Sequence, residues 1–163
     1  MINIDAIKKQ YPLELWAQNP VLRSIAAPVE KITDEMREFG MCLLELMYAY
    51  DWVWLAAPQV WQLIRMAAFT QYSFGEKRIK QTLEDVMINP VILSQASTND
   101  IDVEWCLSLP WVEWSVERPS SIVVEYTTLH GKKTMLKASW YNARIILHEI
   151  DHLDGVLFVD KLV

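Results

Sequence analysis

Residues 148–152 read His-Glu-Ile-Asp-His, an H-E-x-x-H segment that decides how the rest of the chain is interpreted. On an α-helix, residues four positions apart lie on one face, so His148 and His152 can bind one metal ion together. Glu149 lies about 100° around such a helix, where its carboxylate can reach a metal-bound water. A solvated helix face that merely carries two histidines is the alternative. The intervening glutamate and the apolar residues 145–147 favour a site.

The patterns around this segment predict an α+β fold. Ser139 is placed to cap a helix over about residues 141–153, which carries both histidines. Thr33 is a candidate N-cap for a long amphipathic helix that runs to about Tyr50. Mostly antiparallel strands are predicted at residues 63–70, 86–93, 121–128 and 132–137, with a polar loop or hairpin tip at 71–84 and a polar loop at 94–102. We therefore expect one domain over residues 1–163, with strands around a C-terminal metal-binding helix and a long helix in the N-terminal half.

Composition and charge argue against several classes of function. The formal net charge of -6 disfavours binding to nucleic-acid phosphates or to acidic membrane surfaces. The longest uncharged central stretch, residues 52–64, is too short to span a bilayer. The N-terminus lacks the apolar region of a signal peptide, and the two cysteines, Cys42 and Cys106, then indicate a reducing compartment. A cytoplasmic protein that binds neither nucleic acid nor membrane is expected.

A catalytic metal site needs a third protein ligand, because two histidines do not close it. Cys106 is the best candidate and lies in residues 104–108, Glu-Trp-Cys-Leu-Ser. A thiolate is a soft donor that favours Fe(II), Zn(II), Co(II) or Ni(II) over magnesium or calcium. A small buried hydrophobic residue is the other interpretation of Cys106. The H-E-x-x-H segment in the same chain favours the ligand.

Three motifs in a fixed order make the chain resemble a peptide deformylase. That family carries G-x-G-L-A-A-x-Q, then E-G-C-L-S, then H-E-x-D-H. This chain has Trp-Val-Trp-Leu-Ala-Ala-Pro-Gln at residues 52–59, followed by the segments at 104–108 and 148–152. The resemblance extends from Asn19 to Val159. Three ordered motifs are far more specific than the pentapeptide alone.

The resemblance implies a role for each matching residue. Glu149 would take a proton from metal-bound water and later deliver one to the leaving amine, while the Gln59 side chain and the Leu107 backbone N–H would stabilise the oxyanion. The ion would be one divalent metal, with Fe2+ preferred and Zn2+, Ni2+ or Co2+ able to substitute. Its ligands would be Cys106, His148 and His152.

The resemblance also implies the reaction and its substrate. The N-formyl group would be removed from the N-terminal methionine of newly made polypeptides, with release of formate. The expected partners are N-formylmethionyl peptides or nascent chains, with contact to the ribosome left open and a monomer expected. An extended substrate would pair its backbone beside residues 53–55 by strand addition, and its methionine side chain would enter an apolar pocket.

Tryptophan stands at every glycine position of the first two motifs. The chain has 8 tryptophans and 4 glycines, whereas average usage would give roughly 11 glycines. Seven tryptophans fall where family members usually carry glycine: Trp52, Trp54, Trp61, Trp105, Trp111, Trp114 and Trp140. This coincidence indicates a systematic change from glycine to tryptophan, by engineering or by an error in the recorded sequence, and natural drift with aromatic core filling is the alternative. Because Trp54 and Trp105 would place indoles beside the metal or the substrate groove, we expect metal binding but poor turnover of formyl-peptides.

Two further functions stay open from the sequence. A zinc endopeptidase is compatible with H-E-x-x-H alone, but a cysteine ligand and the segment Leu-Ala-Ala-Pro-Gln argue against it. A catalytically impaired or inactive relative that binds peptides or a partner is supported by the aromatic excess, since clustered exposed tryptophans mark interaction surfaces. Exposure of Trp52, Trp54, Trp105 and Trp111 around one groove would favour this second alternative.

Overall fold

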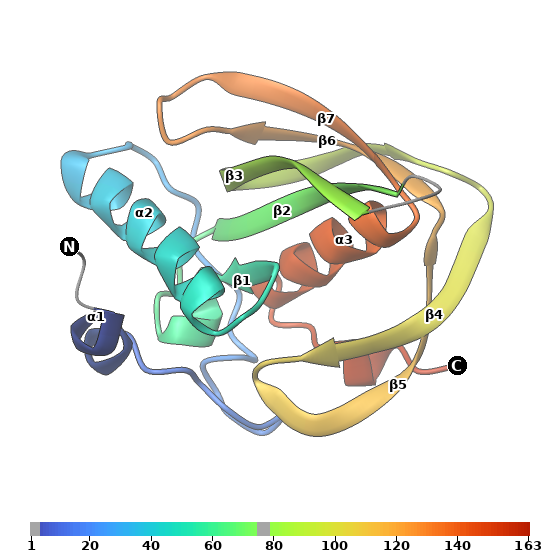
Figure 1. Ribbon diagram of the computed structural model, residues 1–163, viewed down its shortest axis with the longest axis horizontal. Helices are drawn as coiled ribbons and strands as arrows, with labels where there is room; N and C mark the ends of the chain where they lie inside the picture. Colours follow the sequence, from blue (N-terminus) through green and yellow to red (C-terminus); the bar gives the residue numbers. More distant parts are fainter. Residues whose placement is uncertain (1–3, 75–78) are drawn as a thin grey trace.

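A five-stranded antiparallel sheet forms the centre of the computed structural model, which describes residues 4–74 and 79–163 (Figure 1). The strand order is β1-β2-β3-β6-β7. These strands are β1 (Trp54–Ala56), β2 (Met66–Phe74), β3 (Ile79–Gln95), β6 (Ser121–Thr127) and β7 (Lys133–Ser139). A separate antiparallel hairpin is made of β4 (Asn99–Cys106) and β5 (Leu109–Pro119). The predicted α+β fold with mostly antiparallel strands is confirmed.

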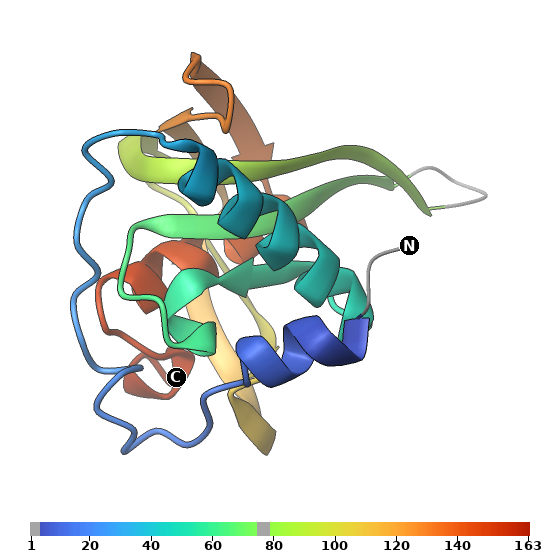
Figure 2. The same ribbon diagram turned by 90° about the vertical axis from the view of Figure 1, so that its left-hand side faces the viewer.

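Two helices cover opposite faces of the five-stranded sheet, α2 (Asp34–Ala49) and α3 (Tyr141–Leu153). Successive side chains of a strand point to opposite faces. Along β2, Phe69 packs into the core with α3, whereas Met66 and Ala68 pack into the core with α2. Figure 2 shows α2 in front of the sheet and α3 behind it. Burial on both faces explains why the start of β2 is a continuous apolar run.

The bounds of both long helices agree with the sequence prediction, but only one predicted cap does. The Thr33 side chain accepts a hydrogen bond from the Met36 N–H at 3.3 Å and caps α2. Ser139 does not cap α3, because it is the last residue of β7 and pairs with Ser121. The N-cap position is taken by Trp140, which makes no side-chain capping bond.

The loop predicted at residues 94–102 is wrong over most of its length. The loop or hairpin tip predicted at 71–84 lies where β2 and β3 pair as a hairpin, but the strands extend further into it than expected. β2 continues to Phe74, β3 already begins at Ile79, and β4 begins at Asn99. Residues 75–78 of the first predicted loop lie outside the described residues. The outer parts of these strands are exposed, so their polar sequence reflects contact with water and carries no signal of a turn.

The remaining elements of the described residues are short helices, and the last of them contacts the hairpin. They are α1 (Ile4–Gln10), η1 (Ala57–Val60) and η2 (Phe158–Asp160). A small core of Leu109 and Val116 from β5 with Leu157 and Phe158 joins the hairpin to the C-terminal segment. Leu162 forms an isolated antiparallel bridge with Val116. Within the described residues, no helix is both long and apolar enough to cross a membrane.

Candidate active site

Helix α3 and the end of β4 bring Cys106, His148 and His152 together. One candidate ligand atom from each residue lies within 4.8 Å of the other two, and all three residues are buried. The two imidazole rings, four positions apart on α3, have centroids 4.9 Å apart. Cys106 Sγ lies 3.2 Å from His152 Nε2. The structure thus joins the histidine pair to the cysteine of a strand more than 40 residues earlier in the chain.

The unpaired atoms of this cluster fit a divalent metal ion. His148 Nε2 is buried and has no hydrogen-bond partner among the described residues, although His148 Nδ1 is paired with Glu104. A buried polar atom without a partner costs free energy, so a ligand is expected at this nitrogen. One sulfur and two imidazoles suit iron, zinc, cobalt or nickel and leave one tetrahedral position open.

Burial sets the protonation states of the cluster in the absence of a cation. It raises the pKa of the Cys106 thiol to about 12, against the opposing effect of hydrogen bonds from Ser108. Burial, together with nearby His148 and Arg118, lowers the pKa of His152 well below its usual value. The imidazole is therefore neutral and able to donate a lone pair. The thiol needs a cation to ionise, which couples metal binding to loss of a proton.

Glu149 is a buried carboxyl group that no other described residue neutralises. Neither carboxylate oxygen has a hydrogen-bond partner in the described part of the chain, and the residue is fully buried. Burial raises the pKa of Glu149 well above its usual value, and the charges of Asp151 and Glu104 act in the same direction. A carboxyl group with a raised pKa next to a metal cluster can accept and return a proton near neutral pH.

Gln59 reaches the same cluster from the short helix η1. Its Oε1 accepts a hydrogen bond from the Ala56 N–H at 2.9 Å, which fixes the orientation of the amide. Its Nε2 donates to Ser108 Oγ at 3.1 Å and to Cys106 Sγ at 3.5 Å. Leu107 follows the cysteine directly and lines the cavity that reaches it. The side-chain amide and this backbone segment therefore lie next to the sulfur.

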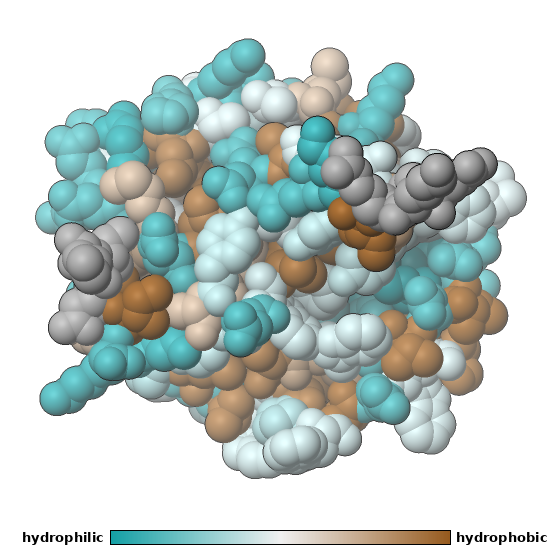
Figure 3. All heavy atoms as spheres, in the orientation of Figure 1, coloured by the Kyte–Doolittle hydropathy of each residue, from teal (hydrophilic) through white to brown (hydrophobic). Residues whose placement is uncertain are grey.

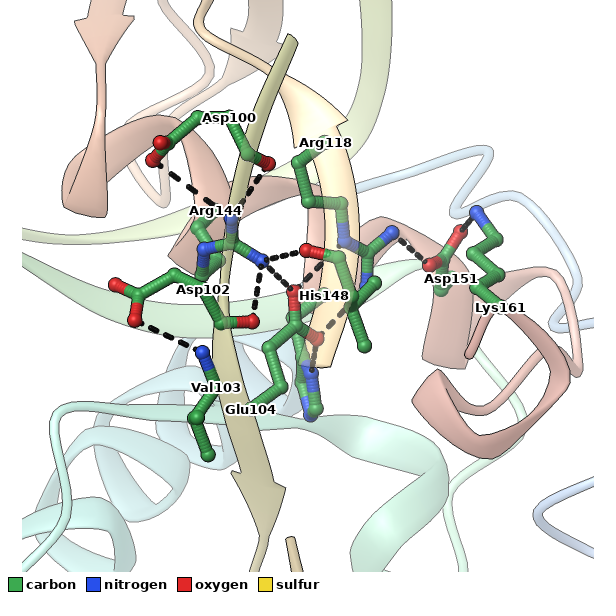
Figure 4. A network of polar contacts seen from close by, with 10 residues as sticks. Asp100, Asp102, Val103, Glu104, Arg118, Arg144, His148, Asp151 and Lys161 are labelled. Atoms are coloured by element: carbon green, nitrogen blue, oxygen red, sulfur yellow. Dashed lines mark hydrogen bonds and ion pairs between the residues drawn. The ribbon is translucent and has the colours of Figure 1, made fainter. Parts of the chain in front are cut away.

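Glu104 holds the metal-binding helix against the hairpin (Figure 4). Its carboxylate accepts two hydrogen bonds from Arg118, at 2.8 and 2.9 Å, and one from Arg144 at 2.9 Å. Glu104 Oε2 also lies 2.9 Å from His148 Nδ1. Burial alone would raise the pKa of Glu104, but the hydrogen bonds from Arg118 and His148 outweigh it and lower the pKa far below its usual value. The carboxylate is therefore ionised and orients the imidazole.

No role for Glu104, Arg118, Asp151 or Arg144 follows from the sequence patterns described above. Asp151 pairs with Arg118, and Arg144 pairs with Glu104, so both belong to the network behind His148. The sequence held one signal for the role of Glu104. This acid lies two residues before Cys106, the candidate metal ligand, in the same strand.

Tryptophans surround the access to the cluster. A cavity of about 520 Å³ reaches Cys106 and is lined by Trp52, Trp105 and Trp111. Trp54 is only 6% exposed, and its ring centroid lies 5.8 Å from that of His148. On the face drawn in Figure 3, brown and pale side chains are more frequent in the lower half, where the β4–β5 hairpin lies. Trp52 thus contacts Trp54 and Trp105, whereas Trp111 lines the same cavity but is 98% exposed.

Comparisons with known proteins agree on one family. Residues 15–163 match the model of the polypeptide deformylase family. The chain is 37% identical to the peptide deformylase of Finegoldia magna, over 88% of this chain and 85% of that protein. It is 41% identical to peptide deformylase 2 of Gloeobacter violaceus, over 87% and 74% of the two chains.

Solved structures give the same result. The crystal structure of a peptide deformylase from Thermotoga maritima superposes with a TM-score of 0.81 at 32% identity and covers 94% of this chain and 98% of that one. A peptide deformylase from Synechococcus elongatus in complex with actinonin gives 0.80 at 38% identity, over 93% and 79% of the two chains. The chain belongs to the polypeptide deformylase family of metal-dependent hydrolases.

Proposed function

We propose that this protein removes the N-formyl group from the N-terminal methionine of newly made polypeptides and releases formate. The observation that carries the proposal is the buried Cys106–His148–His152 cluster, with the unpaired carboxyl group of Glu149 next to it on α3. An endopeptidase would also need a metal and a carboxylate. The cysteine ligand and the deformylase fold favour the formyl group as the leaving acyl group.

Cys106, His148 and His152 would hold one divalent metal ion. Iron(II) is the preferred ion by the family resemblance, and zinc, nickel or cobalt can substitute. When bound, the ion supplies a water nucleophile near neutral pH and polarises the formyl carbonyl. Glu104 keeps the proton of His148 on Nδ1, so that the lone pair of Nε2 is free for the metal.

The other residues move protons and stabilise charge. Glu149, with its raised pKa, takes a proton from the attacking water and returns one to the leaving amine. The Gln59 Nε2 group and the Leu107 backbone N–H donate hydrogen bonds to the oxyanion of the tetrahedral intermediate. Each such donor contributes about 2.7–4 kcal/mol of transition-state stabilisation. Gln59 is held for this role by its hydrogen bond to the Ala56 N–H.

The substrate would be an N-formylmethionyl peptide or a nascent chain. β1 is the edge strand of the five-stranded sheet, so residues 53–55 offer an unpaired edge to an extended peptide. Because the substrate arises at translation, we place the protein in the cytoplasm, as a monomer that acts near the ribosome. One domain over residues 1–163 stays a prediction.

The test is release of formate from an N-formylmethionyl tripeptide by the metal-loaded protein. The N-acetyl tripeptide and a longer unformylated peptide serve as alternative substrates. Glu149→Gln is expected to keep its metal and to lose about 10²–10⁴-fold in kcat, because the proton acceptor is gone. Glu125→Gln, which changes an exposed carboxylate paired with Lys133, is the matched control and should match the parent. Cleavage inside the unformylated peptide without formate release would contradict the proposal and favour an endopeptidase.

A further inference from the structure

Four of the eight tryptophans have backbone angles that favour glycine. Their φ angles are 78° at Trp16, 70° at Trp61, 69° at Trp111 and 55° at Trp140. Among the described residues, the other non-glycine positions with positive φ are Asp51 and Asn89. Asp and Asn enter this region more readily than other side chains, whereas a bulky residue there is an outlier. Every bulky residue in the left-handed region of the described chain is therefore a tryptophan.

Two of these positions match turns and caps that call for glycine specifically. Trp140 has φ 55° and ψ -126°, which is the first central position of a type II′ turn, the usual place of glycine. Trp61 has φ 70° and ψ 8° directly after η1, in the left-handed conformation in which helices commonly end on glycine.

The four indoles are mostly exposed, so they gain little burial that would offset this strain. They are 55% (Trp16), 59% (Trp61), 98% (Trp111) and 63% (Trp140) exposed. None of them belongs to the hydrophobic clusters formed by the described residues. An exposed indole contributes little to folding, because the hydrophobic gain follows the area removed from water. The backbone at these positions suits glycine, and the tryptophan side chain adds nothing in return.

Three other tryptophans fill the space beside the metal cluster. Trp52 packs edge-on against Trp54 and Trp105, with ring centroids 5.4 and 6.4 Å away. The space left between Trp54, Trp105 and His148 is about 10 Å³, which is close to the volume accessible to a single water molecule. The indole nitrogens of Trp52 and Trp54 are buried without a hydrogen-bond partner among the described residues. Under the proposed function, these indoles lie beside the groove that a peptide substrate would enter.

We propose that the active protein carries glycine at all eight tryptophan positions, because the codon concerned is read as glycine in its natural host. The positive φ angles support glycine at Trp16, Trp61, Trp111 and Trp140. Access to the site supports glycine at the three tryptophans of the groove, Trp52, Trp54 and Trp105. The same reading of the codon would also place glycine at Trp114, although the structure gives no separate reason for glycine there. The argument from the groove rests on the proposed function, whereas the argument from the backbone does not.

The first test is the intact mass of the protein isolated from the organism that encodes it, followed by peptide sequencing. The expected mass is lower than that of the written sequence by eight times the difference between a tryptophan and a glycine residue. Tryptophan at any of the four left-handed positions would overturn the proposal.

The second test compares glycine with alanine at single positions by thermal unfolding. Every comparison is made in a chain that has glycine at the other seven positions, so that misfolding of the written sequence cannot hide the result. At Trp140 and Trp61, substitution by glycine should give a melting temperature about 2–4 °C or more above substitution by alanine, because alanine is strained at positive φ. Trp114, inside β5, is the matched control, and there alanine should equal or exceed glycine. Alanine equal to glycine at Trp140 and Trp61 would contradict the proposal.

The third test is formate release at equal metal content. The chain with eight glycines is expected to exceed the written sequence by about 10²-fold or more in kcat/KM, because the written sequence misplaces or excludes the substrate. Equal activity of the two chains would overturn the part of the proposal that concerns the groove. If neither chain releases formate while the mass and stability tests succeed, the proposed function fails and the glycine assignment stands.

Discussion

Glu104 is a buried acid with four polar contacts, and it explains how a charged network is tolerated beside the metal cluster. Arg118, Arg144 and His148 all contact its carboxylate, and Arg118 in turn contacts Asp151. Buried charges are stable only when they are paired and hydrogen-bonded. Each charged group in this network is stabilised by the others. Removal of one charge therefore leaves its partners buried without full charge compensation, which destabilises the fold.

We predict that Glu104→Gln destabilises the protein and weakens metal binding. Two buried guanidinium groups lose one of their anionic partners, which costs about 3–5 kcal/mol of unfolding free energy. The imidazole of His148 loses its orienting carboxylate, and affinity for the metal should fall about 10–100-fold. Denaturant unfolding and metal titration measure the two effects. Equal losses in the exposed control Glu125→Gln, for which about 0–1 kcal/mol is expected, would contradict this account.

The site residues differ in how far the sequence could reveal them. His148, Glu149 and His152 follow from local helix spacing, which is a short-range property that a pattern contains. Cys106 follows from the need for a third ligand, whereas Gln59 and Leu107 were linked to the histidines by the family resemblance. Their positions agree with the predicted assembly, and their catalytic roles stay predictions. The partnership of Glu104 with Arg118 and Arg144 joins residues 14 and 40 positions apart, and no local pattern encodes such a pairing.

The same distinction holds for the elements. Both long helices were predicted within a residue or two, because amphipathic spacing and a cap are local signals. The hairpin of β4 and β5 was missed as a unit, since its strands are largely exposed and their polar residues imitate a loop. Ser139 was a plausible cap by residue type, but pairing within β7 takes precedence over that preference. Pairing between residues far apart in the sequence therefore determines the bounds of the strands that local patterns did not predict.

The contact between Gly155, after the end of α3, and the Arg23 segment can be tested by substitution, with Gly131 as the control. Gly155 follows the helix with φ +70°, and an added Cβ would lie 2.6 Å from the Arg23 carbonyl oxygen. Gly131 has φ +79° in a turn, with nothing within 4 Å of an added Cβ. Gly131→Ala should cost about 1–2 kcal/mol from the left-handed backbone alone. Gly155→Ala should cost clearly more, because the clash displaces the segment at Arg23. Similar denaturation midpoints for the two variants would show that this contact does not position the helix.

At the scale of the whole molecule, the metal would fasten the hairpin to the helical layer. Cys106 ends β4, whereas both histidines lie on α3, so one ion would join two parts of the fold. A ligand that binds only the folded state adds stability in proportion to the logarithm of its concentration. The cluster is therefore expected to be structural as well as catalytic.

We predict that removal of the metal by a chelator lowers the melting temperature. At a free metal concentration 100 times the Kd, the lost stabilisation is about 2.7 kcal/mol. Thermal unfolding with and without chelator measures it, and addition of zinc, nickel or cobalt should restore the transition. Cys106→Ala is the control and should show a much smaller response to chelator. An unchanged melting curve in the parent protein would argue against a bound ion that links the two layers.

The bridge between Leu162 and Val116 has a practical consequence for anyone who expresses this protein. Val116 also uses its carbonyl oxygen to accept a hydrogen bond from Arg144, so the residue sits between the C-terminal segment and the charged network. A purification tag fused directly behind Val163 would begin beside β5, because the Val163 N–H donates a hydrogen bond to the Ser115 carbonyl oxygen. Placing the tag elsewhere, or behind a long flexible spacer, avoids mistaking a handling artefact for weak catalysis.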